Sequence, residues 1–210
     1  GDAGRLLAME GLEHLAEVRT VERGLILLSY HGAVSFVATA LVPLYSGIGP
    51  IEVISAQKAL QEAERQTIAG KGNFAQRWRA LKASSLLDAR RQLCEGGNVL
   101  FAIDGLSSTH EGMDRVIFGH RHRIVAGLSS LALATGSPIL PVMSTMTASG
   151  CVRIVFLPAL QLPARSEPEY IWLDAIADQC ELFLQESWRQ APESLSWGAI
   201  NRHFKLPRVD

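Results

Sequence analysis

The sequence has 210 residues, of which 48% are hydrophobic and 20% are charged, and its formal net charge is −1. These proportions exclude a disordered chain, and the near-zero charge excludes a strong overall positive field for binding nucleic acid. A chain of this length can bury its own core, so we expect a single domain over residues 1–210. No uninterrupted apolar run reaches the roughly 20 residues of a membrane-spanning helix. Three widely spaced cysteines (Cys94, Cys151, Cys180) predict reduced, buried thiols and a cytoplasmic location.

The first half of the chain alternates helical patterns with short apolar runs. A continuous apolar run behind Gly24 predicts a strand buried on both faces. In chain order we predict a helix over residues 11–22, this strand over 24–30, a helix over 33–42 that ends near Pro43, a strand over 51–55, a helix over 57–68, a loop over 70–73 and a helix over 74–94.

The second half continues the alternation. The clearest strand of the sequence covers residues 98–103 and ends at Asp104. After it we predict a polar loop over 106–114, a short extended segment over 116–119, a cationic loop over 120–123, a helix over 125–135, strands over 138–143 and 151–157, and a helix over 169–188. Alternating strands and helices predict an α/β fold, with a mostly parallel central sheet and helices on both faces.

Two polar breaks follow predicted strands, at His31 and at Asp104. Ligands of open α/β sheets bind beyond the carboxyl ends of the strands, so both positions are candidate site residues. The positive end of the helix after His31 disfavours a protonated ring, and a neutral imidazole can take a proton from an attacking hydroxyl. The alternatives are a histidine that only caps its turn and an ordinary Asp104-Gly105 turn.

Several segments, in order, resemble one protein family. They are MEGLEHL (residues 9–15), GLILLSYHG (24–32), the strand and aspartate of 97–104, VIFG (116–119), GLSSLALATGSPILP (127–141) and WGAINRHFK (197–205). Together they are similar to the lipid A biosynthesis acyltransferases, which belong to the lysophospholipid acyltransferase superfamily. The likeness covers nearly the whole chain, and we expect that the family's N-terminal membrane anchor is absent or cut off here.

The resemblance implies that the protein moves a fatty acyl group from an acyl carrier protein or coenzyme A thioester to a hydroxyl or amine of an amphiphilic acceptor. In this reading His31 is the general base, and backbone N–H groups near Gly32 or Gly105 stabilise the oxyanion. Arg121 and Arg123 bind phosphate, although a solvated turn is the simpler explanation of that charge run. No cofactor or nucleic acid is implied, and contact with the membrane, if any, is peripheral at the inner membrane.

One departure from the family pattern concerns the acidic residue that follows the histidine after four residues. Phe36 stands there, and residues 32–35 contain no acid. Three outcomes are open. A carboxylate from elsewhere orients His31, with Asp104 the first candidate and Glu111 or Asp114 next; or Ser35 or a backbone carbonyl holds the ring; or catalysis is lost, and the domain is a non-catalytic module that binds lipid or acyl chains.

Other chemistries have weaker support. A metal site built from His110, His120 and His122, with Glu111 or Asp114, has no recognised zinc spacing. The stretch at residues 127–131 lacks the last glycine of a nucleophile elbow, and no phosphate-binding glycine loop is present. Helical spacing of Phe74, Trp78 and Leu81 predicts core packing; if these side chains are exposed, they are candidates to contact a bilayer or to line an acyl groove.

Overall fold

The structure, a computed structural model, describes residues 7–19, 23–32, 34–49, 51–55, 76–80, 83–104 and 112–195. Within these ranges seven strands form one sheet in the order β1-β9-β8-β2-β5-β3-β4. The strands are β1 (Leu7–Glu10), β2 (Leu25–Ser29), β3 (Ile51–Ser55), β4 (Gln76–Ala80), β5 (Asn98–Ala102), β8 (Ile139–Met146) and β9 (Val152–Phe156). Only β8 and β9 pair in antiparallel fashion among these strands, which confirms the predicted mostly parallel sheet.

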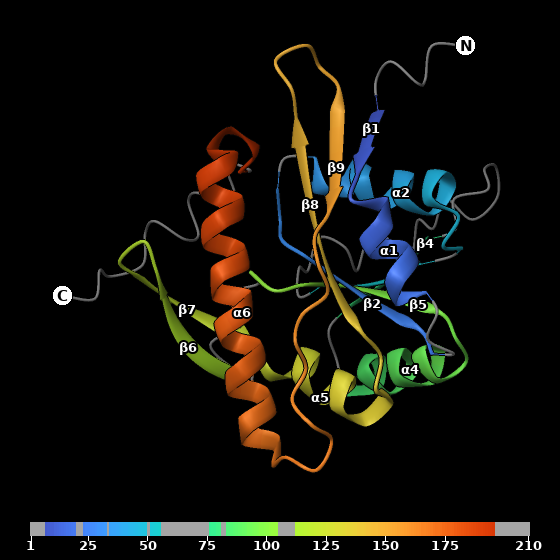
Figure 1. Cartoon of the computed structure of the whole chain (residues 1–210), viewed down its shortest axis with the longest axis vertical. Coiled ribbons are helices and arrows are strands. Elements are labelled where there is room, and N and C mark those ends of the chain that lie inside the picture. The colour runs from blue at the N-terminus through green and yellow to red at the C-terminus, as the bar shows by residue number, and fades with distance from the viewer. Residues whose placement is uncertain are drawn as a thin grey trace.

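Helices cover both faces of this sheet (Figure 1). One hydrophobic core joins the sheet to α4 (Ala83–Cys94), α5 (Ala126–Thr135) and α6 (Glu169–Gln190). A second core joins the opposite face to α1 (Leu12–Val18) and α2 (Ser35–Ser46). Along β2, Ile26 and Leu28 belong to the first core, and Leu25 and Leu27 belong to the second. The continuous apolar run of β2 therefore has a physical reason, since every side chain of this strand is buried.

The register of β2 and β5 positions the candidate site. Leu25 lies opposite Asn98, and Ser29 lies opposite Ala102. The pairing continues past the strand ends, because the Ile103 N–H donates to the Ser29 carbonyl at 3.0 Å. Two residues further on, the same register sets His31 against Asp104, 73 positions later in the chain. Backbone pairing at the centre of the sheet thus brings the two polar breaks together at its carboxyl edge.

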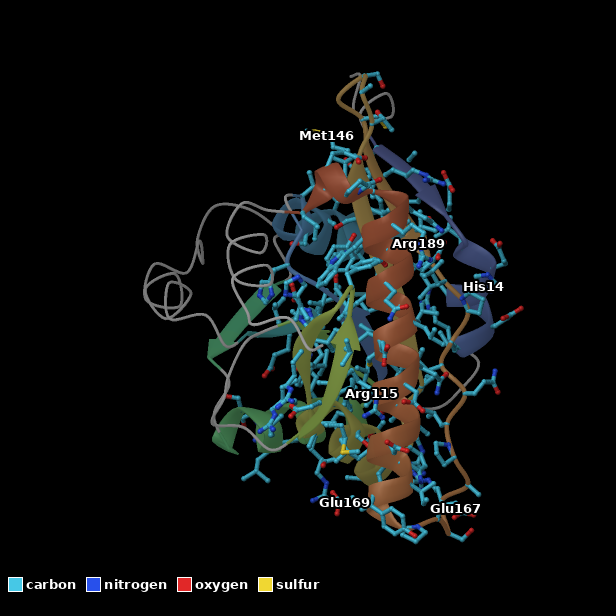
Figure 2. The ribbon with its side chains drawn as sticks, turned by 90° about the vertical axis from the view of Figure 1, so that its left-hand side faces the viewer. His14, Arg115, Met146, Glu167, Glu169 and Arg189 are labelled. Carbon is cyan, nitrogen blue, oxygen red and sulfur yellow. The ribbon has the colours of Figure 1, made fainter. Side chains whose placement is uncertain are left out.

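An antiparallel hairpin outside the main sheet packs against α6 (Figure 1). It consists of β6 (Gly112–Ile117) and β7 (His120–Val125). Figure 2 shows Arg115 where the hairpin meets α6. Its guanidinium lies 2.6 Å from Asp174, 2.8 Å from Asp178 and 3.8 Å from Glu181, and its side chain is 13% exposed. Burial opposes the charged form, but the bonds from Asp174 and Asp178 raise the pKa of Arg115 above its ordinary value.

We expect Arg115→Met to lower the free energy of unfolding by about 1–2 kcal/mol, because it removes several charge-assisted bonds between β6 and α6. Urea unfolding followed by circular dichroism measures this loss. Arg123→Met is the matched control, because the side chains of Arg123 and of its partner Asp114 are each more than a third exposed. That control should lose little or no stability, because solvent screens an exposed ion pair. Equal losses in the two variants would contradict a special role for Arg115.

The prediction that a helix ends near Pro43 is wrong. The helix α2 contains Pro43 and ends instead at Gly47, whose φ of 70° is left-handed. Proline removes one backbone donor but does not forbid the next turn, whereas a left-handed glycine closes a helix readily. The first predicted helix is also too long, because α1 covers only Leu12–Val18.

The single helix predicted over residues 74–94 is wrong as well. Residues Gln76–Ala80 form β4, which pairs in parallel with β3, and only Ala83–Cys94 form the helix α4. Pairing with a sheet edge overrides the helical spacing that suggested one long element. Trp78 therefore lies on a strand rather than on a helical stripe. Phe74, Leu81 and the elements predicted over 57–68 and 70–73 lie outside the described residues.

The predicted cationic loop at residues 120–123 is part of the strand β7, and residues 112–114 of the predicted polar loop belong to β6. The other strand predictions are confirmed within a few residues, and the last helix is confirmed with an extension to Gln190. In the described ranges no helix has both the length and the apolar character needed to cross a membrane. The single-domain organisation over residues 1–210 stays a prediction.

The thiols only partly follow the expectation of burial. All three cysteines are free, and Cys180 is buried in α6, where burial raises the pKa of its thiol. Cys151 is half-buried, but Cys94 is exposed at the end of α4. The prediction of buried thiols is therefore wrong for Cys94, because the last turn of that helix turns this position to solvent.

Candidate active site

His31 stands between the buried strand β2 and the helix α2. The strand ends at Ser29, Tyr30 is still buried, and the His31 side chain is 17% exposed. The helix begins at Ser35 after the turn at Gly32. The predicted position of this histidine, between a strand and a helix, is confirmed, and its side chain is partly accessible to solvent.

Asp104 follows β5, and its side chain has no solvent exposure. One carboxylate oxygen lies 2.6 Å from His31 Nδ1. The His31 backbone N–H points at the same carboxylate, at 2.9 Å from Oδ1 and 3.0 Å from Oδ2. A buried carboxylate is costly unless it is hydrogen-bonded, and His31 provides both a ring donor and a main-chain donor.

This contact determines which ring nitrogen carries the proton. An ionised carboxylate only accepts hydrogen bonds, so Nδ1 is the donor and Nε2 is the basic nitrogen of the neutral ring. The carboxylate also stabilises the imidazolium that forms when Nε2 takes a proton. The arrangement can therefore accept and return a proton while the ring keeps a fixed orientation.

Tyr30 directly follows β2, and its side chain lies in the hydrophobic core that includes residues of α6. Its ring centroid is 5.9 Å from that of Phe183. Burial raises the pKa of the Tyr30 hydroxyl, and the charges of Asp104 and Glu193 raise it further. Tyr30 therefore stays protonated at neutral pH. Its hydroxyl is buried without a hydrogen-bond partner among the described residues.

The turn after His31 uses its own polar groups. The Gly32 N–H donates to the Tyr30 carbonyl at 3.1 Å, and the Ser35 hydroxyl donates to the Gly32 carbonyl at 2.8 Å. The Ser35 hydroxyl donates to the turn, and the carboxylate of Asp104, rather than Ser35, contacts His31 Nδ1. The Gly32 N–H is likewise engaged, which weakens the expectation that it binds an oxyanion.

The predicted phosphate-binding arginines lie on β7 of the hairpin, outside the main sheet. Arg123 donates to Asp114 through Nε at 2.8 Å and through a terminal nitrogen at 3.2 Å. This contact lowers the pKa of Asp114 and raises that of Arg123. Asp114 is thus the partner of Arg123, and its suggested role as the carboxylate for His31 is wrong. Arg121 is exposed on the same strand, opposite Val116.

The two histidines of β7 are buried rather than exposed. His122 contacts Trp188 of α6 edge-on, with ring centroids 5.6 Å apart. Among the described residues, no group of three or more histidines, cysteines or acids could hold a metal ion. Gly105, His110, Glu111 and the segment 197–205 lie outside the described residues, and Phe36 is described only as part of the α2 backbone.

One contact of this site is not predicted by the sequence. Leu195, after α6 and the short 3-10 helix η2 (Pro192–Ser194), forms an antiparallel bridge with Gly32. A Cβ atom on Gly32 would lie 3.1 Å from the Ser194 carbonyl oxygen and 3.2 Å from the Tyr30 ring. Glycine therefore allows the end of the α6 segment to approach the turn beside His31. No local pattern in the sequence signals a contact between segments so far apart.

The fold and the site define a class: an α/β domain with a histidine–aspartate pair at the carboxyl edge of parallel strands, arranged as for general-base catalysis. The sequence profile of one family, described as bacterial lipid A biosynthesis acyltransferase, matches residues 4–205. The chain belongs to this family of acyltransferases of lipid biosynthesis. No curated protein matches the sequence.

Proposed function

We propose that the protein transfers a fatty acyl group from a thioester donor to a hydroxyl or amine of an amphiphilic acceptor. The donor is acyl carrier protein or coenzyme A carrying the acyl chain. The observation that supports this proposal best is the 2.6 Å contact between His31 Nδ1 and Asp104 Oδ1. A carboxylate from a neighbouring strand here stands in for the acid that Phe36 replaces in the family pattern.

In the proposed reaction His31 is the base and Asp104 the orienting acid. Nε2 takes the proton of the acceptor O–H or N–H as the acceptor atom attacks the thioester carbonyl carbon. Asp104 stabilises the imidazolium during this step. The tetrahedral intermediate then expels the thiolate, the C–S bond breaks, and the imidazolium returns its proton to the sulfur. The products are an ester or amide and a free thiol.

Binding of the donor and acceptor needs groups beyond this pair. The thioester itself supplies the activation, so the proposed reaction needs no cofactor. Arg121 is the better candidate of the two arginines for a phosphate group, because Asp114 already occupies much of the Arg123 fork. We place the reaction in the cytoplasm, with peripheral contact at the inner membrane, where amphiphilic acceptors reside.

The competing function is a non-catalytic module that binds acyl chains on the same fold. Phe36 favours it, since the family's usual acid is missing from its usual place. The Asp104–His31 contact favours catalysis, because a binding module has no need of a buried carboxylate on a ring nitrogen.

One assay separates the two functions. The purified protein is incubated with acyl-coenzyme A or acyl carrier protein, together with an amphiphile that offers a free hydroxyl or a free amine. Catalysis predicts equal amounts of free thiol and of new ester or amide, measured by a thiol reagent and by mass spectrometry. Calorimetric binding of the thioester, with neither product formed, would instead support the binding module.

A further inference from the structure

The turn that joins β6 to β7 contains a residue that does not suit its backbone. Phe118 and Gly119 form a two-residue connection, with Ile117 paired to His120. Both residues have positive φ, 51° for Phe118 and 77° for Gly119, which is the pattern of a type I′ turn. Asn-Gly is the preferred pair for this turn, and a positive φ is unusual for a bulky side chain. Among the described residues, Phe118 is the single non-glycine with positive φ.

The Phe118 ring is also placed unusually for an aromatic side chain. It stacks on Trp188 of α6, with centroids 6.4 Å apart and planes inclined by 29°. Nevertheless 44% of Phe118 is exposed. Backbone strain is retained at positions where a particular side chain is needed. The turn geometry does not require phenylalanine, so the backbone conformation does not account for the exposed aromatic ring at this position.

Phe118 and Gly32, the residue after His31, contact the same segment of chain. Trp188 is near the end of α6, and the chain continues through η2 to Leu195, which pairs with Gly32 next to His31. Leu195 packs on the hydrophobic core that contains Trp188. One stretch of chain, residues 188–195, therefore contacts both Phe118 and the turn that follows His31.

We propose that Phe118, supported by Trp188, contacts the aliphatic chain of the acyl substrate and determines the preference for chain length. This inference rests on the proposed acyl transfer. The ring offers an apolar face to a chain that already occupies the site at His31, so its contribution grows with the number of methylene groups that reach it. Short chains end before Phe118 and gain nothing from it.

The test compares hexanoyl- and tetradecanoyl-coenzyme A in wild type and in Phe118→Asn. Asparagine suits the turn, so the variant should fold with an unchanged or higher Tm. Its kcat/KM for the tetradecanoyl donor should fall about tenfold, while that for the hexanoyl donor stays unchanged. Phe118→Gly is a second variant compatible with positive φ and should behave in the same way.

Two controls separate the ring from general effects on the hairpin. Phe118→Tyr keeps an aromatic ring and should keep the wild-type preference. Val116→Asn removes a comparably exposed apolar side chain from the same hairpin and should leave the preference unchanged. An equal loss for both donors in Phe118→Asn, or a shift of preference in Val116→Asn, would overturn the inference.

Calorimetric binding of the two thioesters keeps this inference distinct from the proposed function. Suppose that wild type binds the tetradecanoyl donor without turnover and that Phe118→Asn weakens this binding about tenfold. The proposed acyl transfer is then refuted, and the proposed contact between Phe118 and the acyl chain is supported. If wild type catalyses transfer and Phe118→Asn keeps the same preference for chain length, the proposed contact is refuted and acyl transfer is supported. If wild type neither binds nor converts either donor, both ideas are rejected.

Discussion

Replacement of His31 by alanine is expected to reduce thioester turnover by about 10⁴-fold or more, because the proposed reaction uses this side chain as its general base. The variant should fold normally. The main-chain N–H that bonds to Asp104 remains, and the side chain lies at the solvent edge rather than in a core. The measurement is thiol release under saturating donor, with circular dichroism as the check on folding.

His14→Ala is the matched control for His31→Ala. His14 lies on α1, 3.7 Å from Glu17, with its side chain 28% exposed, and it belongs to neither strand end. This variant should keep wild-type turnover. Equal turnover in wild type and His31→Ala would refute the assignment of the base, whatever the result for His14.

Asp104→Asn should lower kcat by about 10³- to 10⁴-fold while the fold persists. An asparagine oxygen can still accept from the His31 backbone N–H. However, its amide can donate to Nδ1, which moves the ring proton to Nε2 and removes the basic nitrogen from the acceptor. The loss should appear in kcat rather than in KM for the donor, since Asp104 acts through His31 and does not touch the substrate.

Asp114→Asn provides the comparison for Asp104→Asn. Both replacements remove one carboxylate charge, but Asp114 pairs with Arg123 on the hairpin. We expect little change in turnover from Asp114→Asn. If Asp104→Asn retains full activity, another group must orient His31, and the long-range histidine–aspartate pair is then structural only.

Much of the site could be predicted from the sequence because both of its residues follow strong strand signals. The apolar run before His31 and the run before Asp104 each stop at a polar residue. Because parallel strands present such residues at one edge of the sheet, the sequence favours Asp104 as the carboxylate that orients His31. The register that sets residue 31 against residue 104 is a property of the assembled sheet, and no local pattern encodes it.

The errors share a physical origin in contacts between distant segments. The strand β4 forms on the edge of β3 although its residues have helical spacing. The cationic run of residues 120–123 is extended because it pairs with β6 and packs on α6. Pro43 continues a helix that local rules would end. In each case tertiary pairing or packing outweighs a local preference of about 1–3 kcal/mol.

The separation of His31 and Asp104 along the chain also changes when the protein can be active. A histidine and an acid five positions apart remain neighbours on one turn even when the rest of a chain is loose. Here 73 positions intervene, and only the adjacency of β2 and β5 keeps the two groups together. A newly synthesised, heat-loosened or cleaved chain without that adjacency has an unoriented imidazole. Catalytic activity therefore requires the completed central sheet, and partly folded molecules are expected to be inactive.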